Sequence, residues 1–260
     1  MRLEIAVLSK AGGREPNEDA FGCWSARDAS FCLLSDGAGG HGGGDVASKL
    51  AVRAALAWFQ NSPECSGANI ASALRSAHDA IMLSQRAGDG LANMRATAVV
   101  LAVDTAHASA FWGHLGDTRL YCFRNEAQLA RTKDHSVVQR MVDAGYLREE
   151  DLRRAPDRSQ LFAALGEDEN FSPTVSDVPL ALIDGDAFLL CSDGFWEYID
   201  DAAIAEALAG AATPEHWLAS MEQQVIAHGG KDQDNYSAMA VWCGENARMP
   251  TASPRPERDT

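Results

Sequence analysis

Two aspartates in this chain each stand between an apolar run and a glycine. The two segments read Phe31-Cys-Leu-Leu-Ser-Asp36-Gly37 and Phe188-Leu-Leu-Cys-Ser-Asp193-Gly194. Each has the form of a buried strand that carries a carboxylate at its end and then turns sharply on glycine. Burying a charged carboxylate is costly unless a cation compensates for it. The repeated pattern therefore predicts that two strand ends converge on metal.

Three other acidic segments stand far apart in the sequence and could join the same site. They are Asn17-Glu18-Asp19, Gly116-Asp117-Thr118-Arg119 and Asp232-Gln-Asp234-Asn235. Taken one at a time, these aspartates are more often ordinary turn residues, and Asp117 fits the end of a hairpin. Taken together, a carboxylate-rich ligand set without cysteine and with little histidine suits hard octahedral cations such as Mg²⁺ or Mn²⁺.

Two other motifs resemble known chemistry less well. In the glycine-rich run 37–44, the glycines have phosphate-loop spacing, but Asp45 and Val46 stand where Lys and Ser/Thr are required. We interpret the run as a tight turn into a helix that lets main chain approach a metal or its waters. Asp184-Gly185-Asp186 begins like an aspartyl-phosphate motif, but it precedes its strand, so a capped turn is the better interpretation.

The histidines and tryptophans carry weaker signals. His41, His114 and His135 could bind metal, but the seven histidines show no HxxxH or HxH spacing. A hydrogen-bonding role behind the ligands is the simpler interpretation. Four tryptophans stand in apolar runs and are most simply core residues: Trp58, Trp112, Trp196 and Trp217.

Length and charge limit the classes of protein that fit. The 260 residues suit one large domain with a real core, and the net charge of −15 argues against nucleic acid or an anionic membrane as a partner. An anionic substrate is still compatible, because local cations can outweigh the global field. Four of the six cysteines lie in strand-like runs without CxxC spacing, which indicates small buried hydrophobic residues in a reducing cytosol. Without a signal peptide or an apolar run of membrane length, we expect a soluble, cytoplasmic protein.

The apolar pattern predicts many strands between two early and two late helices. Helices are expected at 44–60, 67–87, 200–210 and 214–228. Strands are expected at 3–9, 20–25, 30–35, 95–104, 107–115, 119–124, 127–131, 172–179, 186–192 and 235–243. Short turns between strands favour antiparallel pairing. We therefore predict an α+β fold in which two antiparallel sheets pack together with a helix pair outside each.

Two segments break this pattern. Residues 135–170 contain short polar helices around 135–144 and 148–154, followed by Pro156 and a charged loop, and we expect a surface insertion with its own mobility. Residues 245–260 are polar and proline-rich, so a disordered tail is expected after a domain that covers 1–244.

In sequence order, the motifs resemble those of the metal-dependent type 2C protein serine/threonine phosphatases, especially the compact bacterial form. The resemblance covers roughly residues 4–243. The matching segments are Gly13-Arg14-Glu-Pro-Asn17-Glu18-Asp19-Ala20, Leu34-Ser-Asp36-Gly37-Ala-Gly-Gly40-His41, Arg95-Ala-Thr97, Gly116-Asp117-Thr118-Arg119-Leu-Tyr121, Leu129-Ala-Arg-Thr132-Lys-Asp134-His135-Ser136, Leu165-Gly166, Leu190-Cys-Ser-Asp193-Gly194-Phe-Trp196 and Asp232-Gln-Asp234-Asn235. Membership would imply an αββα sandwich with metals in a cleft at one end of the sheets, and a flap at about 136–170 beside it.

The resemblance also implies roles for single residues. Asp36 would bridge two metal ions, and Asp193 and Asp234 would complete the first site. The Gly37 carbonyl would serve the second site, with Glu18 or Asp19 holding that ion directly or through water. Asp117 would share a third, weaker ion with Asp193. Arg14 would grip the substrate phosphate, since its planar fork fits phosphate oxygens.

This family implies hydrolysis of phosphoserine and phosphothreonine by a hydroxide that bridges two Mn²⁺ or Mg²⁺ ions, without a covalent intermediate. Two positions depart from the family pattern. Ala38 stands where eukaryotic members have a histidine that protonates the leaving alcohol, which leaves a metal-bound water or His41 as the acid. Ala155 precedes Pro156 in the flap, where relatives often have a polar residue, and this affects substrate preference.

Three functions are compatible with these residues. The first is an active phosphatase, expected to be a monomer, that acts on proteins phosphorylated by a cognate Ser/Thr kinase. The second is a non-catalytic module that binds a phosphoprotein through the same fold, which loss of metal carboxylates would favour; here all are present. The third is a phosphatase dedicated to one partner in a signalling or secretion system. Hydrolysis assays with and without Mn²⁺ separate the enzyme from the binding module.

Overall fold

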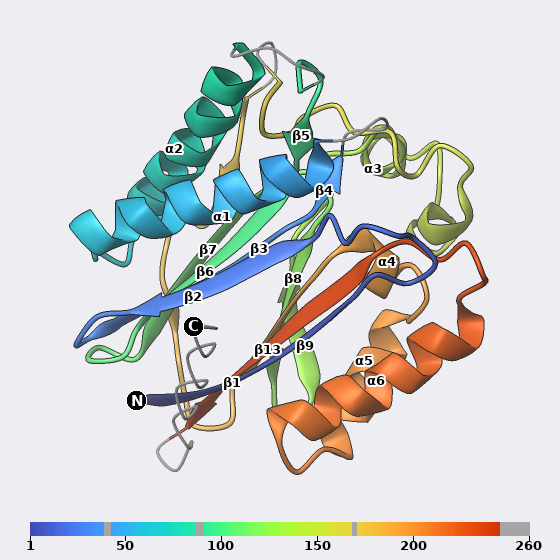
Figure 1. Ribbon diagram of the computed structural model, residues 1–260. Helices are drawn as coiled ribbons and strands as arrows, with labels where there is room; N and C mark the ends of the chain where they lie inside the picture. Colours follow the sequence, from blue (N-terminus) through green and yellow to red (C-terminus); the bar gives the residue numbers. More distant parts are fainter. Residues whose placement is uncertain (39–42, 87–90, 168–170, 245–260) are drawn as a thin grey trace, which may run out of the picture.

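The computed structural model describes residues 1–38, 43–86, 91–167 and 171–244. Two antiparallel sheets face each other, with one pair of helices outside each sheet (Figure 1). Helices α1 (Gly44–Asn61) and α2 (Gly67–Arg86) cover one sheet, and α5 (Asp201–Ala209) and α6 (Pro214–His228) cover the other. The predicted α+β arrangement of four layers, an αββα sandwich, is therefore confirmed.

The first sheet has the strand order β1-β13-β12-β8-β9. Its strands are β1 (Arg2–Lys10), β13 (Tyr236–Gly244), β12 (Ala187–Cys191), β8 (Arg119–Arg124) and β9 (Ala127–Arg131). The ends of the described chain meet here, because β1 pairs with β13 over its whole length, from Arg2 opposite Gly244 to Lys10 opposite Tyr236. This pairing brings the segment after β1 beside the segment before β13, which carries Asp234.

The second sheet has the order β10-β7-β6-β3-β2, and β11 also pairs with β7. Its strands are β10 (Thr174–Val175), β7 (Ser109–Leu115), β6 (Ala98–Asp104), β3 (Ala29–Ser35), β2 (Ala20–Ser25) and β11 (Leu180–Ala181), and β4 (Gly37–Ala38) pairs separately with β5 (Arg95–Ala96). Two predicted strands differ from this. The run 95–104 breaks at Thr97 into β5 and β6, and the run 172–179 forms only the short β10 before β11.

Three apolar layers fill the spaces between the four structural layers. Along β3, Phe31 and Leu33 pack toward α1 and α2, whereas Cys32 and Leu34 pack between the sheets. On β12, Leu189 faces the α5–α6 side, in the same cluster as Trp217. Both faces of these strands are buried, which explains why their sequences are continuous apolar runs and do not alternate.

Four expectations about local structure need correction. Trp58 is 38% exposed, because it lies on the outer side of α1, where its indole nitrogen donates to Asn69. Trp112 is only partly buried. Cys23 is exposed on β2, although Cys32, Cys122, Cys191 and Cys243 are buried and all six cysteines in the described chain are free. The one-turn helix α4 (Asp193–Trp196) begins where only a turn was expected.

The insertion after β9 contains α3 (Val137–Asp143) and the 3₁₀ helix η1 (Glu149–Arg154). An isolated bridge between Ser136 and Leu161 closes the segment on itself, and a second bridge, between Ala96 and Leu165, ties its later part to β5. Within the part of the chain that the structure describes, no helix is long and apolar enough to cross a membrane. The predicted tail, 245–260, lies outside the described residues.

Candidate active site

Asp36 and Asp193 stand at corresponding ends of β3 and β12, which belong to opposite sheets. Their carboxyl groups lie close enough for each to influence the pKa of the other. Burial, followed by the charge of Asp193, raises the pKa of Asp36 well above its usual range. Burial, followed by the charge of Glu197, raises the pKa of Asp193 to about 7. The two strand ends thus deliver two carboxylates to one point, and neither can compensate the negative charge of the other.

Asp19 supplies a third carboxylate, which is buried. It is 7% exposed, and its Oδ2 accepts a hydrogen bond of 2.9 Å from the Ser192 hydroxyl. Its Oδ1 has no hydrogen-bond partner among the described residues. Burial raises the pKa of Asp19 to about 6, although hydrogen bonds from Ser237 and Ser192 lower it. A buried carboxylate oxygen without a donor is a group that a cation would satisfy.

Glu18 lies against the glycines that frame the turn after Asp36. A Cβ atom on Gly44 would stand 2.7 Å from the Glu18 Cδ, and one on Gly37 would stand 2.1 Å from the Gly44 carbonyl oxygen and 2.8 Å from that of Glu18. Only glycine allows so close an approach of main chain. Burial raises the pKa of Glu18, and the charges of Asp45 and Asp234 add to this effect. From its sequence position, Asp45 counts only against a phosphate loop, and its proximity to Glu18 was not predicted.

Asp117 does not lie at the end of a hairpin, although its sequence indicates one. Its neighbours β7 and β8 belong to different sheets, so the turn crosses the sandwich, and the hairpin prediction is wrong. The turn begins at Gly116, which has a left-handed φ of +99°. Asp117 is only 4% exposed. Burial and then the charge of Asp193 raise its pKa well above the usual range. The crossover therefore places a second buried carboxylate, after Asp19, near Asp193.

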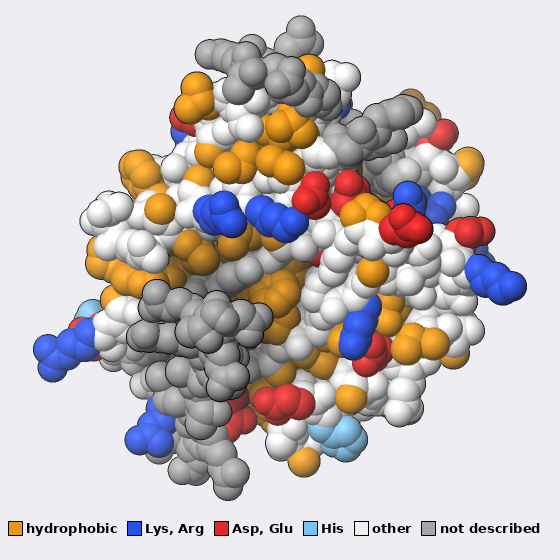
Figure 2. All heavy atoms as spheres, in the orientation of Figure 1, with side chains coloured by type: hydrophobic (Ala, Val, Ile, Leu, Met, Phe, Trp, Pro, Cys, Tyr) orange, Lys and Arg blue, Asp and Glu red, His pale blue; other side chains and the backbone are white. Residues whose placement is uncertain are grey.

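Arg14 and Asp234 form the exposed side of the site. Their ion pair is 3.0 Å long, and both side chains are at least half exposed. The Arg14 loop packs tightly on the loop before β13, because a Cβ on Gly13 would lie 2.0 Å from the Lys231 carbonyl oxygen. Asn235 fastens the same region, since its Oδ1 accepts from the Glu18 main-chain nitrogen at 2.8 Å. Figure 2 shows acidic and basic side chains gathered at this end of the sheets, between α1 and α4.

The histidines take supporting positions. His135 Nδ1 lies 3.2 Å from the Gly116 main-chain nitrogen, from which it accepts a hydrogen bond. Burial lowers its pKa to about 4. His114 stacks on His135, and its Nε2 lies 2.7 Å from the Lys133 carbonyl oxygen. The hydrogen-bonding interpretation therefore fits His114 and His135, whereas His41 lies outside the described residues. Ala38 is exposed on β4.

The arrangement fits hard cations through its donor chemistry. The structure places six carboxylates close enough to influence one another's charge, beside the Gly37 main chain: Glu18, Asp19, Asp36, Asp117, Asp193 and Asp234. In the described ranges, no three His, Cys, Asp or Glu side chains are already grouped closely enough to hold a metal ion. The raised pKa values and the unpartnered Asp19 oxygen show that a divalent cation would relieve the repulsion in this cluster.

Proteins similar to this chain in sequence and in fold are serine/threonine phosphatases. A family model described as "Protein phosphatase 2C" matches residues 9–232. The serine/threonine phosphatase stp of Listeria innocua is 28% identical over 225 residues, covering 84% of this chain and 88% of the relative. The crystal structure of the Mycobacterium tuberculosis phosphatase PstP/Ppp superposes with a TM-score of 0.80 and 27% identity, covering 94% of this chain and 99% of that one. The catalytic domain of PstP "in complex with 2 Manganese ions" gives a TM-score of 0.75 and 28% identity, with coverage of 94% and 99%.

The chain belongs to the protein phosphatase 2C family. It is a serine/threonine phosphoprotein phosphatase of the bacterial form, and the resemblance found in the sequence is confirmed.

Proposed function

We propose that the enzyme hydrolyses phosphoserine and phosphothreonine at a binuclear Mn²⁺ or Mg²⁺ centre built from the carboxylate cluster. When bound, a pair of divalent cations supplies an activated water and neutralises the charge that develops on the phosphate. The observation that carries the proposal is the meeting of Asp36 and Asp193 from opposite sheets. The negative charges of neighbouring carboxylates raise the pKa of each of these two groups.

The proposed ligands follow from position. Asp36 would hold both ions, Asp193 and Asp234 would complete the first site, and the Gly37 carbonyl would serve the second with Glu18 or Asp19. The unpartnered Oδ1 of Asp19 supports direct binding by this residue. Asp117 would hold a third, weaker ion together with Asp193, and the influence of the Asp193 charge on the pKa of Asp117 supports this. The two manganese ions of the PstP complex support the number of tight sites.

Arg14 is proposed to bind the substrate phosphate. In the structure its guanidinium is engaged by Asp234 at the exposed side of the site. A cation on Asp234 would compete with Arg14 for the same carboxylate and release the guanidinium toward an incoming phosphate. Arginine suits this role because its planar donors match phosphate oxygens.

Several features of the whole protein belong to the same proposal. We infer a single phosphatase domain over 1–244 with the flap at about 136–170 beside the metal site, and phosphorylated substrates of a cognate Ser/Thr kinase in a signalling system. A monomer with a cytoplasmic location is expected.

Hydrolysis of p-nitrophenyl phosphate and of a phosphothreonine peptide tests the proposal. We expect no turnover by metal-stripped protein in EDTA, and recovery when Mn²⁺ or Mg²⁺ is added in excess of the chelator, because the nucleophile depends on the cations. Full turnover with chelator present throughout would contradict the two-metal mechanism. Binding of the phosphopeptide without hydrolysis at any Mn²⁺ concentration would favour the non-catalytic module instead.

A further inference from the structure

Trp196 makes three different connections around the metal site. It ends the one-turn helix α4, which begins with Asp193. Its indole nitrogen donates a hydrogen bond of 2.9 Å to the main-chain carbonyl oxygen of Asp117. Its own carbonyl oxygen accepts a hydrogen bond of 3.1 Å from the Arg153 Nε in η1. One residue therefore touches the chain of Asp193, the turn of Asp117 and the flap.

The indole ring cannot move freely in this position. Trp196 is 1% exposed, and the Arg119 guanidinium lies 3.4 Å above its ring centroid. Arg119 is itself buried and donates to both carboxylate oxygens of Asp134, at 2.8 and 2.6 Å. A shift of the ring would uncover a buried charge whose other contacts are fixed, which is costly. The stack thus holds the indole N–H toward the Asp117 carbonyl.

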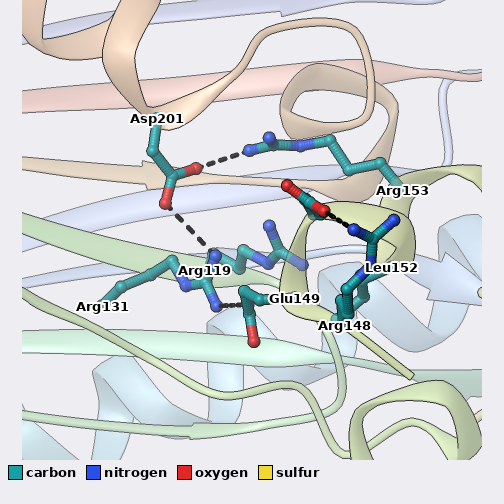
Figure 3. Close-up of a pocket in the computed structure, with 8 residues that line it drawn as sticks. Arg119, Arg131, Arg148, Glu149, Leu152, Arg153 and Asp201 are labelled. Atoms are coloured by element: carbon teal, nitrogen blue, oxygen red, sulfur yellow. Dashed lines mark hydrogen bonds and ion pairs between the residues drawn. The ribbon is translucent and has the colours of Figure 1, made fainter. Parts of the chain in front are cut away.

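The flap side of this arrangement is shown in Figure 3. A cavity of about 390 Å³ separates η1 from β8, β9 and α5, and Arg119, Arg131, Arg153 and Asp201 line it. The two carboxylate oxygens of Asp201 reach different arginines, Oδ1 to Arg153 at 2.5 Å and Oδ2 to Arg131 at 3.2 Å. Both arginines share the Asp201 contact, but the hydrogen bond to Trp196 comes from Arg153.

We propose that Trp196 is a positioning residue that sets the geometry between Asp117 and Asp193, and that Arg153 makes this geometry sensitive to the position of the flap. The inference rests on the proposed third cation site. Asp193 moves with α4, whereas Asp117 belongs to the turn between β7 and β8, and the indole hydrogen bond is the direct link between them. Losing that bond would free the Asp117 turn and weaken the binding of the cation that the two carboxylates would share.

The test compares two tryptophans in the full chain. Trp196→Phe keeps a ring under Arg119 but removes the N–H. Trp217→Phe is the matched control, because Trp217 is also fully buried and its indole donates to a main-chain carbonyl, that of Ile204, at 3.1 Å. Both variants should lose similar thermal stability. Only Trp196→Phe should raise the Mn²⁺ concentration for half-maximal hydrolysis of p-nitrophenyl phosphate, by about tenfold, as expected for one buried hydrogen bond.

Calorimetric titration of metal-stripped protein gives a readout that does not depend on activity. Trp196→Phe should keep the two tight Mn²⁺ sites and weaken the third. The double variant with Asp117→Ala should be no worse than Asp117→Ala alone, because Trp196 acts through Asp117. A shift no larger than that of Trp217→Phe, or additive effects in the double variant, would overturn the inference.

A second pair of variants keeps the test decisive even if Trp196→Phe folds poorly. Arg153→Ala and Arg131→Ala both remove an ion pair with Asp201 and a contact that holds η1, since Arg131 also pairs with Glu149. Only the first removes a contact with Trp196. We expect Arg153→Ala alone to raise the Mn²⁺ requirement. Equal effects of the two would refute a connection from the flap through Trp196. If Asp117→Ala itself leaves the Mn²⁺ requirement unchanged, the proposed third site fails; if Asp117→Ala shifts it and Trp196→Phe does not, only the positioning role fails.

Discussion

Arg14 donates a hydrogen bond of 3.0 Å to Asp234 across 220 positions of sequence. The pair joins the proposed phosphate-binding residue to a proposed metal ligand at the exposed side of the site. An exposed ion pair of this kind contributes about 0–1 kcal/mol to stability. Because the pair is exposed and contributes little to stability, it can exchange partners. The cation would then bind Asp234, and the phosphate would bind Arg14.

Arg14→Ala should therefore impair catalysis without unfolding the protein. We expect KM for a phosphopeptide to rise together with some loss of kcat, so that kcat/KM falls about 10- to 100-fold. The melting temperature should change little. Arg148→Ala is the matched control, since Arg148 is also exposed and pairs with Glu150 and Asp151 within the flap. Unchanged kcat and KM in Arg14→Ala would remove its assigned role.

Asp193→Asn should abolish turnover while it stabilises the metal-free protein. Because folding raises the pKa of Asp193 to about 7, the folded state binds a proton more tightly than the unfolded state does. Stability is then greatest below the unfolded pKa near 4 and is lost as pH rises toward 7. Asp19, with a pKa of about 6, acts in the same direction.

Thermal unfolding in EDTA at pH 5 and pH 7.5 measures this effect. The variant should gain melting temperature over the wild type, and the gain should be larger at pH 7.5 than at pH 5. Excess Mn²⁺ should reverse the order, because only the wild type keeps the ligand. A gain that is equal at both pH values would show that the Asp193 carboxylate is not destabilising in the metal-free fold.

The sequence predicted the layers well, because their cause is local. Strands buried on both faces read as unbroken apolar runs, and Thr213-Pro214 marks a helix start that the structure shows as the N-cap and first residue of α6. The convergence of Asp36 and Asp193 could be predicted for the same reason, since each follows such a run. The prediction that Trp58 is a core residue was wrong, because an amphipathic indole can lie on an outer helix surface with its N–H satisfied there.

The features that were missed depend on which strands pair. Nothing in Gly116-Asp117-Thr118 says that β7 and β8 join different sheets, and only this crossover buries Asp117. The break at Thr97 likewise serves contacts far away in sequence, since its main-chain nitrogen donates to the Asp36 carbonyl oxygen at 2.8 Å. Such contacts, and the approach of Asp45 to Glu18, come from the assembled sandwich.

Gly37→Ala should disable the site through backbone sterics. The added Cβ would lie 2.1 Å from the Gly44 carbonyl oxygen, so the main chain must move and the Gly37 carbonyl must leave its place. We expect loss of hydrolysis and weaker Mn²⁺ binding by calorimetry, with some loss of stability. Gly230→Ala is the control, because its Cβ would meet no described atom within 4 Å. Normal Mn²⁺ binding by Gly37→Ala would exclude the Gly37 main chain from the site.

Asp117→Ala distinguishes a cation ligand from a turn residue. The main-chain carbonyl that accepts from Trp196 is retained in the variant, so the turn should keep its fold. If Asp117 shares a cation with Asp193, that ion has few protein ligands and mostly water, and its affinity is weak. We expect kcat to fall about tenfold or more while calorimetry still finds two tight Mn²⁺ sites. Asp177→Ala, at an exposed position, shows what an ordinary loop aspartate contributes. Equal activity of both variants at saturating Mn²⁺ would return Asp117 to a purely structural role.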